Sequence, residues 1–239
     1  MRIRVIVPII VGIFDEEVKR EFRTYASEGT EIDVVHLDRG PASIESEYDE
    51  ALAVPDILNK TIEAEKEGFD GVIIDCFGDP GVKPAREVVS IPVVGAAEPS
   101  MLFASSLGQR FSVVTVLKNV IPMIENIAKV LGVYEKLASV RSIEIPVLEL
   151  HDKERLKKEL FEEMLRAIEE DGAHVLILGC TGMMGVADSL HEMLREKGYD
   201  VPVIDPAAAS VKFLEAVIGL GVKHSRLTYM TPPEKERKV

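Results

Sequence analysis

Short apolar runs alternate with longer amphipathic segments along most of this chain. The runs have the length and the continuous apolar character of strands buried in parallel sheets. The segments between them repeat apolar residues every three or four positions, as helices with one buried face do. One such series stops shortly before Gly172, and glycine commonly ends helices. This alternation predicts an α/β fold in which helices cover both faces of parallel sheets.

The pattern occurs twice, once in each half of the chain. A pattern repeated in this way indicates a duplicated structural unit. The sequence therefore predicts two doubly wound lobes related by a pseudo-twofold axis, each with a four-stranded parallel sheet. Strands are expected at 2–8, 31–37, within 68–76 and at 91–95 in the first half, and at 110–116, 142–148, within 172–180 and at 201–205 in the second half.

Proline, glycine and strand order set further boundaries. A helix of the first half is expected to open at Pro55 and Asp56 and to close at Gly68. A last helix, at about 207–220, follows the final strand and is expected to cross back and pack on the first half. The expected domains are a first lobe of residues 1–97 and 207–228, a second lobe of residues 98–206, and a flexible tail of residues 229–239.

The composition favours a cytoplasmic enzyme over a protein that binds membranes or nucleic acid. The chain has 239 residues, 46% of them hydrophobic, and a formal net charge of −13. This charge repels nucleic acid and anionic membranes, and no apolar run approaches the roughly 20 residues of a membrane span. The amino terminus lacks a signal-peptide pattern, so the cysteines are expected to be free thiols. Gln occurs once, Asn three times and Trp never, and such amide depletion is typical of thermophile proteins.

The two cysteines of the chain, Cys76 and Cys180, occupy equivalent positions in the repeat. Each directly follows a strand-containing segment and precedes a turn that contains glycine, at 77–81 and at 181–185. Ligands of open α/β sheets bind beyond the carboxyl ends of the strands, so two such cysteines can face each other across a cleft. A cysteine after a buried strand is also commonly a small core residue. The matched positions before glycine turns favour a functional pair.

Two opposed thiols suit proton transfer at a carbon next to a carbonyl. One, as thiolate, can remove a proton from one face, and the other, as thiol, can return a proton to the opposite face. The reference pKa of cysteine, about 8.5, allows both forms to be reached. Backbone N–H groups of the turns and the helix N-termini after them would stabilise a thiolate. Neither cysteine has a second Cys or a His at metal-ligand spacing, so no metal site is expected.

Three segments carry a family resemblance: CFGDPG at 76–81, GCTGM at 179–183 and PVVGAAE at 92–98. They are similar to motifs of the aspartate/glutamate/hydantoin racemase superfamily, most nearly of its hydantoin and allantoin racemase branch. The resemblance covers most of the chain. It implies racemisation without pyridoxal phosphate, metal or any other cofactor, with Cys76 and Cys180 as the two acid/base groups.

The sequence departs from this family at two places that bear on the substrate. Residues 8–12, PIIVG, replace the Asn-Pro-Asn-Thr-like turn that is usual after the first strand of the hydantoin racemase branch. Amino-acid racemases of the superfamily tend to have a histidine two residues after the second cysteine, where this chain has Gly182. A free amino acid therefore lacks two expected partners. A 5-substituted hydantoin or a related cyclic ureide is the favoured substrate.

Residues of the two cysteine turns and of the facing strand ends are candidates for substrate contact. Backbone N–H groups of the turns could hold a flat ring, and apolar side chains beside them could contact its substituent. Thr115 could bond to a ring carbonyl or a carboxylate, and Asp79 could accept from a ring N–H. The candidates are Ile9, Phe77, Gly78, Asp79, Thr115, Thr181, Gly182 and Met183.

Several of these residues also fit purely structural positions. Ile9 fits a core position, Met183 could cover a sheet edge, and Asp79 is followed by Pro-Gly, a common turn sequence. Lys118 could bind an anionic group, although a lysine at a strand exit is more commonly exposed. Glu98 and Asp205 are each expected to cap the helix that follows.

Three functions stay open. The leading interpretation is a two-cysteine racemase of hydantoin type that acts on a small molecule. The second is an aspartate/glutamate-type racemase, or an isomerase or decarboxylase of the same superfamily, in which one cysteine could suffice. The third is a non-catalytic small-molecule-binding protein on the same scaffold, because fold alone does not decide function. Neither nucleic acid nor a membrane is an expected partner, and assembly into a homo-oligomer stays open.

Overall fold

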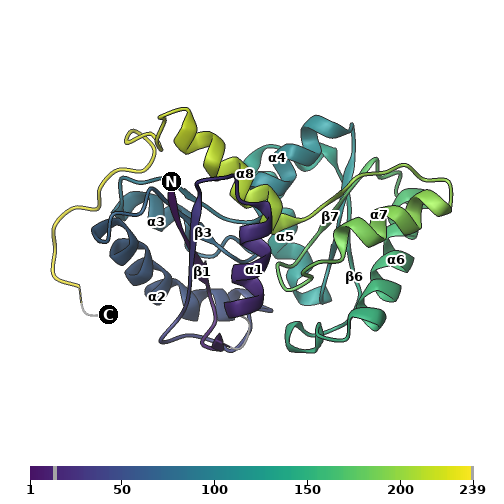
Figure 1. The fold of residues 1–239 in the computed structure, drawn as a ribbon, viewed down its shortest axis with the longest axis horizontal. Helices are drawn as coiled ribbons and strands as arrows, with labels where there is room; N and C mark the ends of the chain where they lie inside the picture. The colour runs from purple at the N-terminus through teal and green to yellow at the C-terminus, as the bar shows by residue number, and fades with distance from the viewer. Residues whose placement is uncertain (13–14, 238–239) are drawn as a thin grey trace.

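Two lobes lie side by side in the computed structural model, which describes residues 1–12 and 15–237 (Figure 1). The first lobe contains the strands β1 (Arg2–Val7), β2 (Glu31–His36), β3 (Gly71–Ile74) and β4 (Val93–Val94), and the second contains β5 (Phe111–Thr115), β6 (Leu137–Ser142), β7 (Val175–Leu178) and β8 (Val203–Ile204). Each set forms a parallel sheet, in the order β2-β1-β3-β4 and β6-β5-β7-β8. The matching orders confirm the predicted duplicated α/β unit.

Helices cover both faces of each sheet, since every residue of β3, β5 and β7 is buried. Short 3₁₀ turns occur at Lys118–Val120, Tyr134–Lys136 and Val147–Glu149. The helices are α1 (Asp15–Tyr25), α2 (Glu47–Lys66), α3 (Val82–Val88), α4 (Ala97–Leu107), α5 (Ile121–Leu131), α6 (Lys153–Glu169), α7 (Ala187–Glu196) and α8 (Pro206–Gly219).

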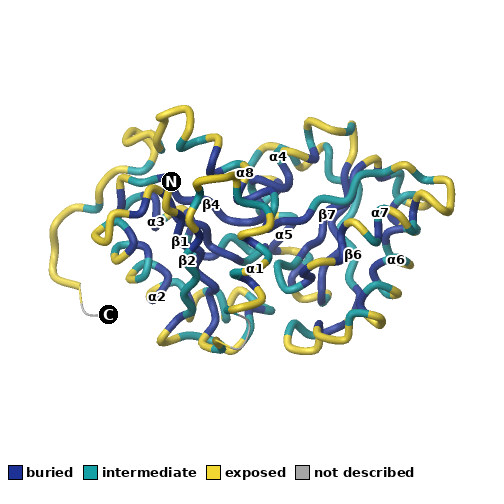
Figure 2. The backbone as a smooth tube through the Cα atoms, in the orientation of Figure 1, coloured by how far each residue is buried: buried dark blue, intermediate teal, exposed yellow. Residues whose placement is uncertain are grey.

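Each lobe has its own hydrophobic core, visible as the buried centre of each half in Figure 2. The first core gathers around β1 and β3, and the second gathers around β5 and β7. The continuous apolar runs of the sequence correspond to these central strands, which are buried on both faces. Parallel neighbours end at the same edge of a sheet, so residues that follow β3 and β7 lie at the carboxyl edges of their sheets.

Helix α8 leaves the second sheet and packs on the first lobe, as expected (Figure 1). Its residues Ala207, Val211 and Leu214 belong to the first core. Asp205 caps its N-terminus by accepting hydrogen bonds from the backbone N–H groups of Ala207 and Ala208, at 2.9 and 3.2 Å, which confirms the predicted cap. This return connects the two lobes a second time, in addition to the link through α4.

The second strand of the second half lies earlier than predicted. The expected strand at 142–148 is wrong, because β6 covers Leu137–Ser142 and a 3₁₀ turn follows at Val147–Glu149. Pro146 has no N–H for a strand ladder, and Glu144 has a φ of 54°, outside the strand region. Residues 143–151 instead form a loop at the carboxyl edge of the sheet.

Helix α2 begins earlier than predicted. The expected start at Pro55–Asp56 is wrong, because the helix runs from Glu47 and contains Pro55. Ser46 caps it by accepting from the N–H of Asp49, and the first turn carries three acidic residues, which the helix dipole favours. Pro55 lies on the exposed side of the helix, where water can satisfy the carbonyl group that loses its partner.

The final segment follows α8 along the first lobe. Tyr229, the first residue of the predicted tail, accepts a hydrogen bond from Arg86 at 3.0 Å. Residues 231–237 contain no helix or strand, and Lys238 and Val239 lie outside the described residues. The flexibility of 229–239 and the lobe boundaries at 97 and 206 stay predictions. Within residues 1–12 and 15–237, no helix combines the length and apolar character needed to cross a membrane.

Candidate active site

Cys76 and Cys180 lie at the carboxyl edges of the two sheets, where β3 and β7 end. Both are free thiols and both are partly exposed. They line one cavity, which also takes residues from both lobes and has a volume of about 110 Å³. That is several times the space that one water molecule needs. The structure therefore brings the two thiols, which are far apart in sequence, to a single site large enough for a small molecule.

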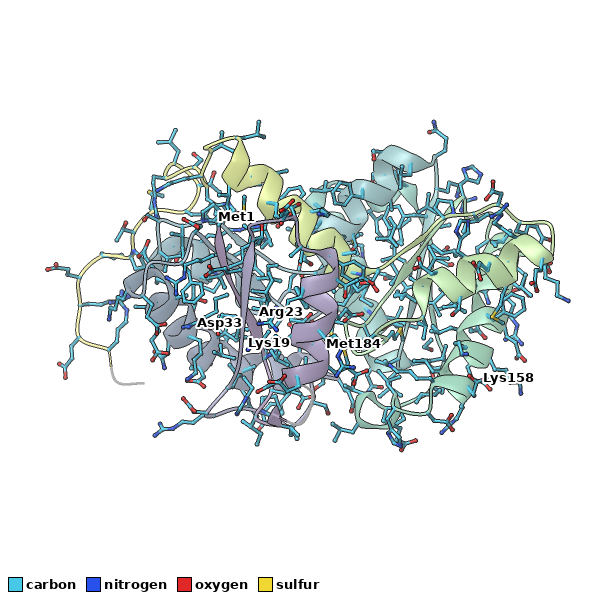
Figure 3. The ribbon with its side chains drawn as sticks, in the orientation of Figure 1. Met1, Lys19, Arg23, Asp33, Lys158 and Met184 are labelled. Carbon is cyan, nitrogen blue, oxygen red and sulfur yellow. The ribbon has the colours of Figure 1, made fainter. Side chains whose placement is uncertain are left out.

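The turns after the two cysteines pack reciprocally across the lobe boundary. Phe77, which follows Cys76, is buried in the core of the second lobe, although it belongs to the first. Met184, which follows Cys180 by four residues, is buried in the core of the first lobe and lies beside α1 in Figure 3. Each turn is thus held by the opposite lobe. This exchange fixes both cysteines at the boundary between the lobes.

Six of the eight predicted substrate contacts line the cavity. Their positions combine an apolar wall with backbone groups of both turns. Thr115 is fully buried, and its hydroxyl donates to the carbonyl of Gly179 at 3.0 Å. Direct contact of these residues with a substrate stays a prediction. The six are Ile9, Phe77, Gly78, Thr115, Thr181 and Gly182.

Asp79 is not among the residues that line the cavity, and its contact with a ring N–H stays a prediction. Its carboxylate accepts hydrogen bonds from the backbone N–H groups of Ala96, Ala97 and Glu98, at 2.7, 2.8 and 2.9 Å. These are orphan donors at the start of α4, which carboxylates commonly satisfy. Burial raises the pKa of Asp79 to about 6 in spite of these bonds. Asp79 joins the cysteine turn to α4.

Three other predicted positions differ from the structure. Met183 is 1% exposed in the second core and does not line the cavity, where Met184 lies instead. Lys118 is exposed at the start of a 3₁₀ turn and also lies outside the cavity lining. Glu98 does not cap a helix after Pro99, because α4 already begins at Ala97 and the Glu98 carboxylate pairs with Arg86.

The electrostatic environment holds both cysteines as neutral thiols. Burial raises the pKa of Cys76 well above its ordinary value, and the nearby carboxyl of Glu50 adds to the shift. Burial likewise raises the pKa of Cys180, to about 12. A backbone N–H of each following turn opposes the shift, including that of Gly182, which lies 3.4 Å from the Cys180 sulfur. The backbone N–H groups that were predicted to stabilise a thiolate are therefore present, but burial raises the pKa of each cysteine by more than these groups lower it.

Sequence reasoning missed two acidic residues of the cavity, Glu50 and Asp75. Each has a buried carboxylate oxygen without a hydrogen-bond partner among the residues that the structure describes. Burial raises the pKa of each carboxyl to about 7. Asp75 directly precedes Cys76, so its position in the motif could have signalled it. Glu50 belongs to the first turn of α2, and no local sequence pattern connects it with the cysteines.

Known proteins are similar to this chain in sequence and in its two-lobed fold. The family model described as Asp/Glu/Hydantoin racemase matches residues 14–214. The hydantoin racemase of Pseudomonas sp. (strain NS671) is 42% identical over 238 residues, which are 99% of this chain and 94% of that protein.

Two solved structures are similar over nearly their whole length. The allantoin racemase from Klebsiella pneumoniae has a TM-score of 0.91 at 37% identity, and the match covers 99% of this chain and 95% of that one. The allantoin racemase from Pseudomonas fluorescens has a TM-score of 0.93 at 33% identity, and the match covers 100% of both chains.

Proposed function

The chain belongs to the Asp/Glu/hydantoin racemase family and is a racemase, and on this premise we propose that it inverts the chiral carbon of a 5-substituted hydantoin or a related cyclic ureide. The proposal assigns proton transfer to Cys76 and Cys180. One observation carries it: two free cysteines, one from each lobe and each at a strand end, line the same cavity. The names of the similar proteins, hydantoin and allantoin racemases, support a cyclic ureide as substrate.

The proposed reaction needs only a proton acceptor and a proton donor on opposite faces of the ring. The thiolate of one cysteine removes the proton from the carbon next to the ring carbonyl, and the electron pair of that C–H bond moves onto the carbonyl oxygen as an enolate. The thiol of the other cysteine then gives its proton to the opposite face, which restores the carbonyl and leaves that cysteine as thiolate. No atom is gained or lost, so no cofactor takes part in this scheme.

The cavity supports a ring with an apolar substituent better than a charged amino acid. Its wall includes apolar side chains such as Ile9, Phe77 and Met123. Its acidic side chains, among them Glu50 and Asp75, would repel a substrate carboxylate. A cyclic ureide is uncharged and offers N–H donors to these acids.

The test of the proposed function is a panel of single enantiomers followed by circular dichroism. We expect the signal of a 5-substituted hydantoin or of allantoin to decay to zero in the presence of the enzyme, at rates far above the uncatalysed decay. Evolution of carbon dioxide from a malonate-type acid without racemisation of any ureide would favour the decarboxylase alternative. Membership of a racemase family argues against a purely binding role.

Free aspartate and glutamate are expected to be poor substrates. Gly182 offers no side chain to a zwitterion, and residues 8–12 offer no polar side chain either. We expect kcat/KM for either amino acid to be at least about 100-fold below that for a 5-substituted hydantoin. The reason is that the charged groups of the amino acid would be left without partners in the site, which costs a large amount of binding free energy. Parallel polarimetry on both substrate classes measures the ratio. A higher efficiency with aspartate or glutamate would assign the site to amino acids.

The rate is expected to increase with pH because the resting thiols are neutral. Burial raises the pKa of both cysteines further above neutrality, and it raises that of Cys180 to about 12. At any pH below its pKa, the thiolate fraction of a cysteine rises about tenfold per pH unit. We therefore expect kcat/KM on a 5-substituted hydantoin to rise by about that factor per unit between roughly pH 6 and 8. Initial rates, corrected for base-catalysed racemisation without enzyme, measure the slope. A plateau across this range would mean that a thiolate exists before substrate binds.

A cytoplasmic location, the absence of nucleic acid and membrane partners, and assembly into a homo-oligomer stay predictions from the sequence. The net charge of −13 supports the second of these. Light scattering of the purified protein would determine its oligomeric state.

A further inference from the structure

Glu50 is a carboxylate of the cavity wall whose hydrogen bonding within the described residues is incomplete. It lies in the first turn of α2 and lines the cavity with Cys76 and Gly78. Its Oε1 atom is buried and has no hydrogen-bond partner among residues 1–12 and 15–237. A buried polar atom without a partner is costly to the fold. A bound ligand that donates a hydrogen bond would remove this cost.

The position of Gly78 shows how close Glu50 lies to the reactive thiol. A Cβ atom added to Gly78 would lie 2.0 Å from Oε1 of Glu50 and 3.8 Å from the sulfur of Cys76. The carboxylate and the thiol therefore share one corner of the cavity. Glycine at this position leaves that corner open, since any side chain would collide with the carboxylate.

Other polar side chains of the cavity already have partners. Thr181 donates to the carbonyl of Asp75, at 3.1 Å, and Lys153 donates to the carbonyl of Met184, at 3.0 Å. Asp75 also has an oxygen without a partner, but its charge acts on both cysteines, whereas the charge of Glu50 raises the pKa of Cys76 more than that of Asp75 does and is not among the causes of the shift at Cys180. Glu50 is thus the acceptor that stands beside the thiol of Cys76.

We propose that Glu50 accepts a hydrogen bond from the ring N–H bonded to the reacting carbon, and that this contact selects cyclic ureides. The inference rests on the proposed function, in which the thiol of Cys76 contacts that carbon. The ring neighbours of this carbon in a hydantoin are one N–H group and one carbonyl group. A carboxylate accepts hydrogen bonds and does not donate them, so the group in reach that it can bind is the N–H. Burial raises the pKa of Glu50 to about 7 in the empty site, and an N–H donor would favour the ionised form.

The test compares 5-benzylhydantoin with two derivatives that carry one N-methyl group each. In the first, the methyl group replaces the hydrogen on N1, which is bonded to the reacting carbon. In the second, it replaces the hydrogen on N3, which lies between the two carbonyl groups. In the wild type, methylation at N1 is expected to lower kcat/KM by about 10- to 100-fold, the loss expected for a hydrogen bond to a charged group. In Glu50→Ala, the parent hydantoin should lose a similar factor, and methylation at N1 should cost little more. Methylation at N3 should cost the same in both enzymes.

Two further variants separate recognition from folding. Glu50→Gln retains an acceptor oxygen, so we expect an intermediate loss with the parent substrate. Glu63→Ala removes an exposed carboxylate of the same helix and is expected to behave as the wild type. Thermal unfolding of each variant shows whether its fold is intact.

Each outcome has a definite meaning. An equal penalty for methylation at N1 in the wild type and in Glu50→Ala would overturn this inference while the racemase function stands. So would an unchanged kcat/KM of Glu50→Ala and Glu50→Gln with the parent hydantoin. A wild type that racemises no hydantoin would overturn the proposed function, and this inference with it.

Discussion

Replacement of either cysteine by serine is expected to abolish racemisation, with a loss of at least about three orders of magnitude in kcat. A serine hydroxyl is too weak an acid to replace the thiol as proton donor. Its alkoxide form is too sparsely populated at neutral pH to replace the thiolate as proton acceptor. Cys76→Ser and Cys180→Ser should therefore fail equally, although each still has one thiol in the cavity. Circular dichroism of a single hydantoin enantiomer over hours measures the residual rate.

The remaining thiol should still perform half of the reaction. Each variant is expected to exchange the carbon-bound proton of one enantiomer with deuterium from heavy water, and the two variants should prefer opposite enantiomers. This follows from the origin of the two cysteines in different lobes, since the proposed mechanism has one act on each side of the ring. Proton NMR of each enantiomer with each variant gives the four exchange rates. The same preference in both variants, or near-normal racemisation by one of them, would indicate chemistry at a single cysteine.

Replacement of Asp79 by alanine is expected to destabilise the protein by about 2–4 kcal/mol, because three backbone N–H groups at the start of α4 lose their acceptor. Asp79 also has a φ of 50°, which alanine adopts at a cost. Urea unfolding followed by circular dichroism measures the change.

Asp79→Asn is the matched control for this prediction. Asparagine keeps one acceptor oxygen and tolerates a positive φ, so we expect it to retain most of the stability. Unchanged stability of Asp79→Ala together with weaker substrate binding would contradict the capping role. It would instead support the contact with a ring N–H that the sequence predicted.

The sequence predicted what the repeat and the strand pattern determine. Buried parallel strands leave a continuous apolar run, and the same run before Cys76 and Cys180 placed both residues at sheet edges. Ligands of open α/β sheets bind beyond the carboxyl edge, so cysteines at these edges are expected at a ligand site. The fold and the shared cavity of the two thiols therefore followed from local patterns that occur twice.

The remaining parts of the site depend on contacts that no local pattern encodes. Glu50 reaches the cavity because α2 starts at Glu47, earlier than Pro55 suggested. Asp79 turns toward α4 because that helix offers three unpaired N–H groups. Met184 rather than Met183 lines the cavity because the turn packs on the opposite lobe. Such choices arise from tertiary packing between segments distant in sequence.

The isotope content of the product in heavy water tests the two-cysteine racemisation most directly. One enantiomer of a 5-substituted hydantoin is incubated with the wild-type enzyme, and both enantiomers are separated early in the reaction and analysed by mass spectrometry. We predict that the newly formed enantiomer carries deuterium at the inverted carbon from the first time point, because its proton comes from a second group that exchanges with solvent. The recovered starting enantiomer should carry much less deuterium. A product that retains the original hydrogen would contradict the account, since a single group would then remove and return the same proton.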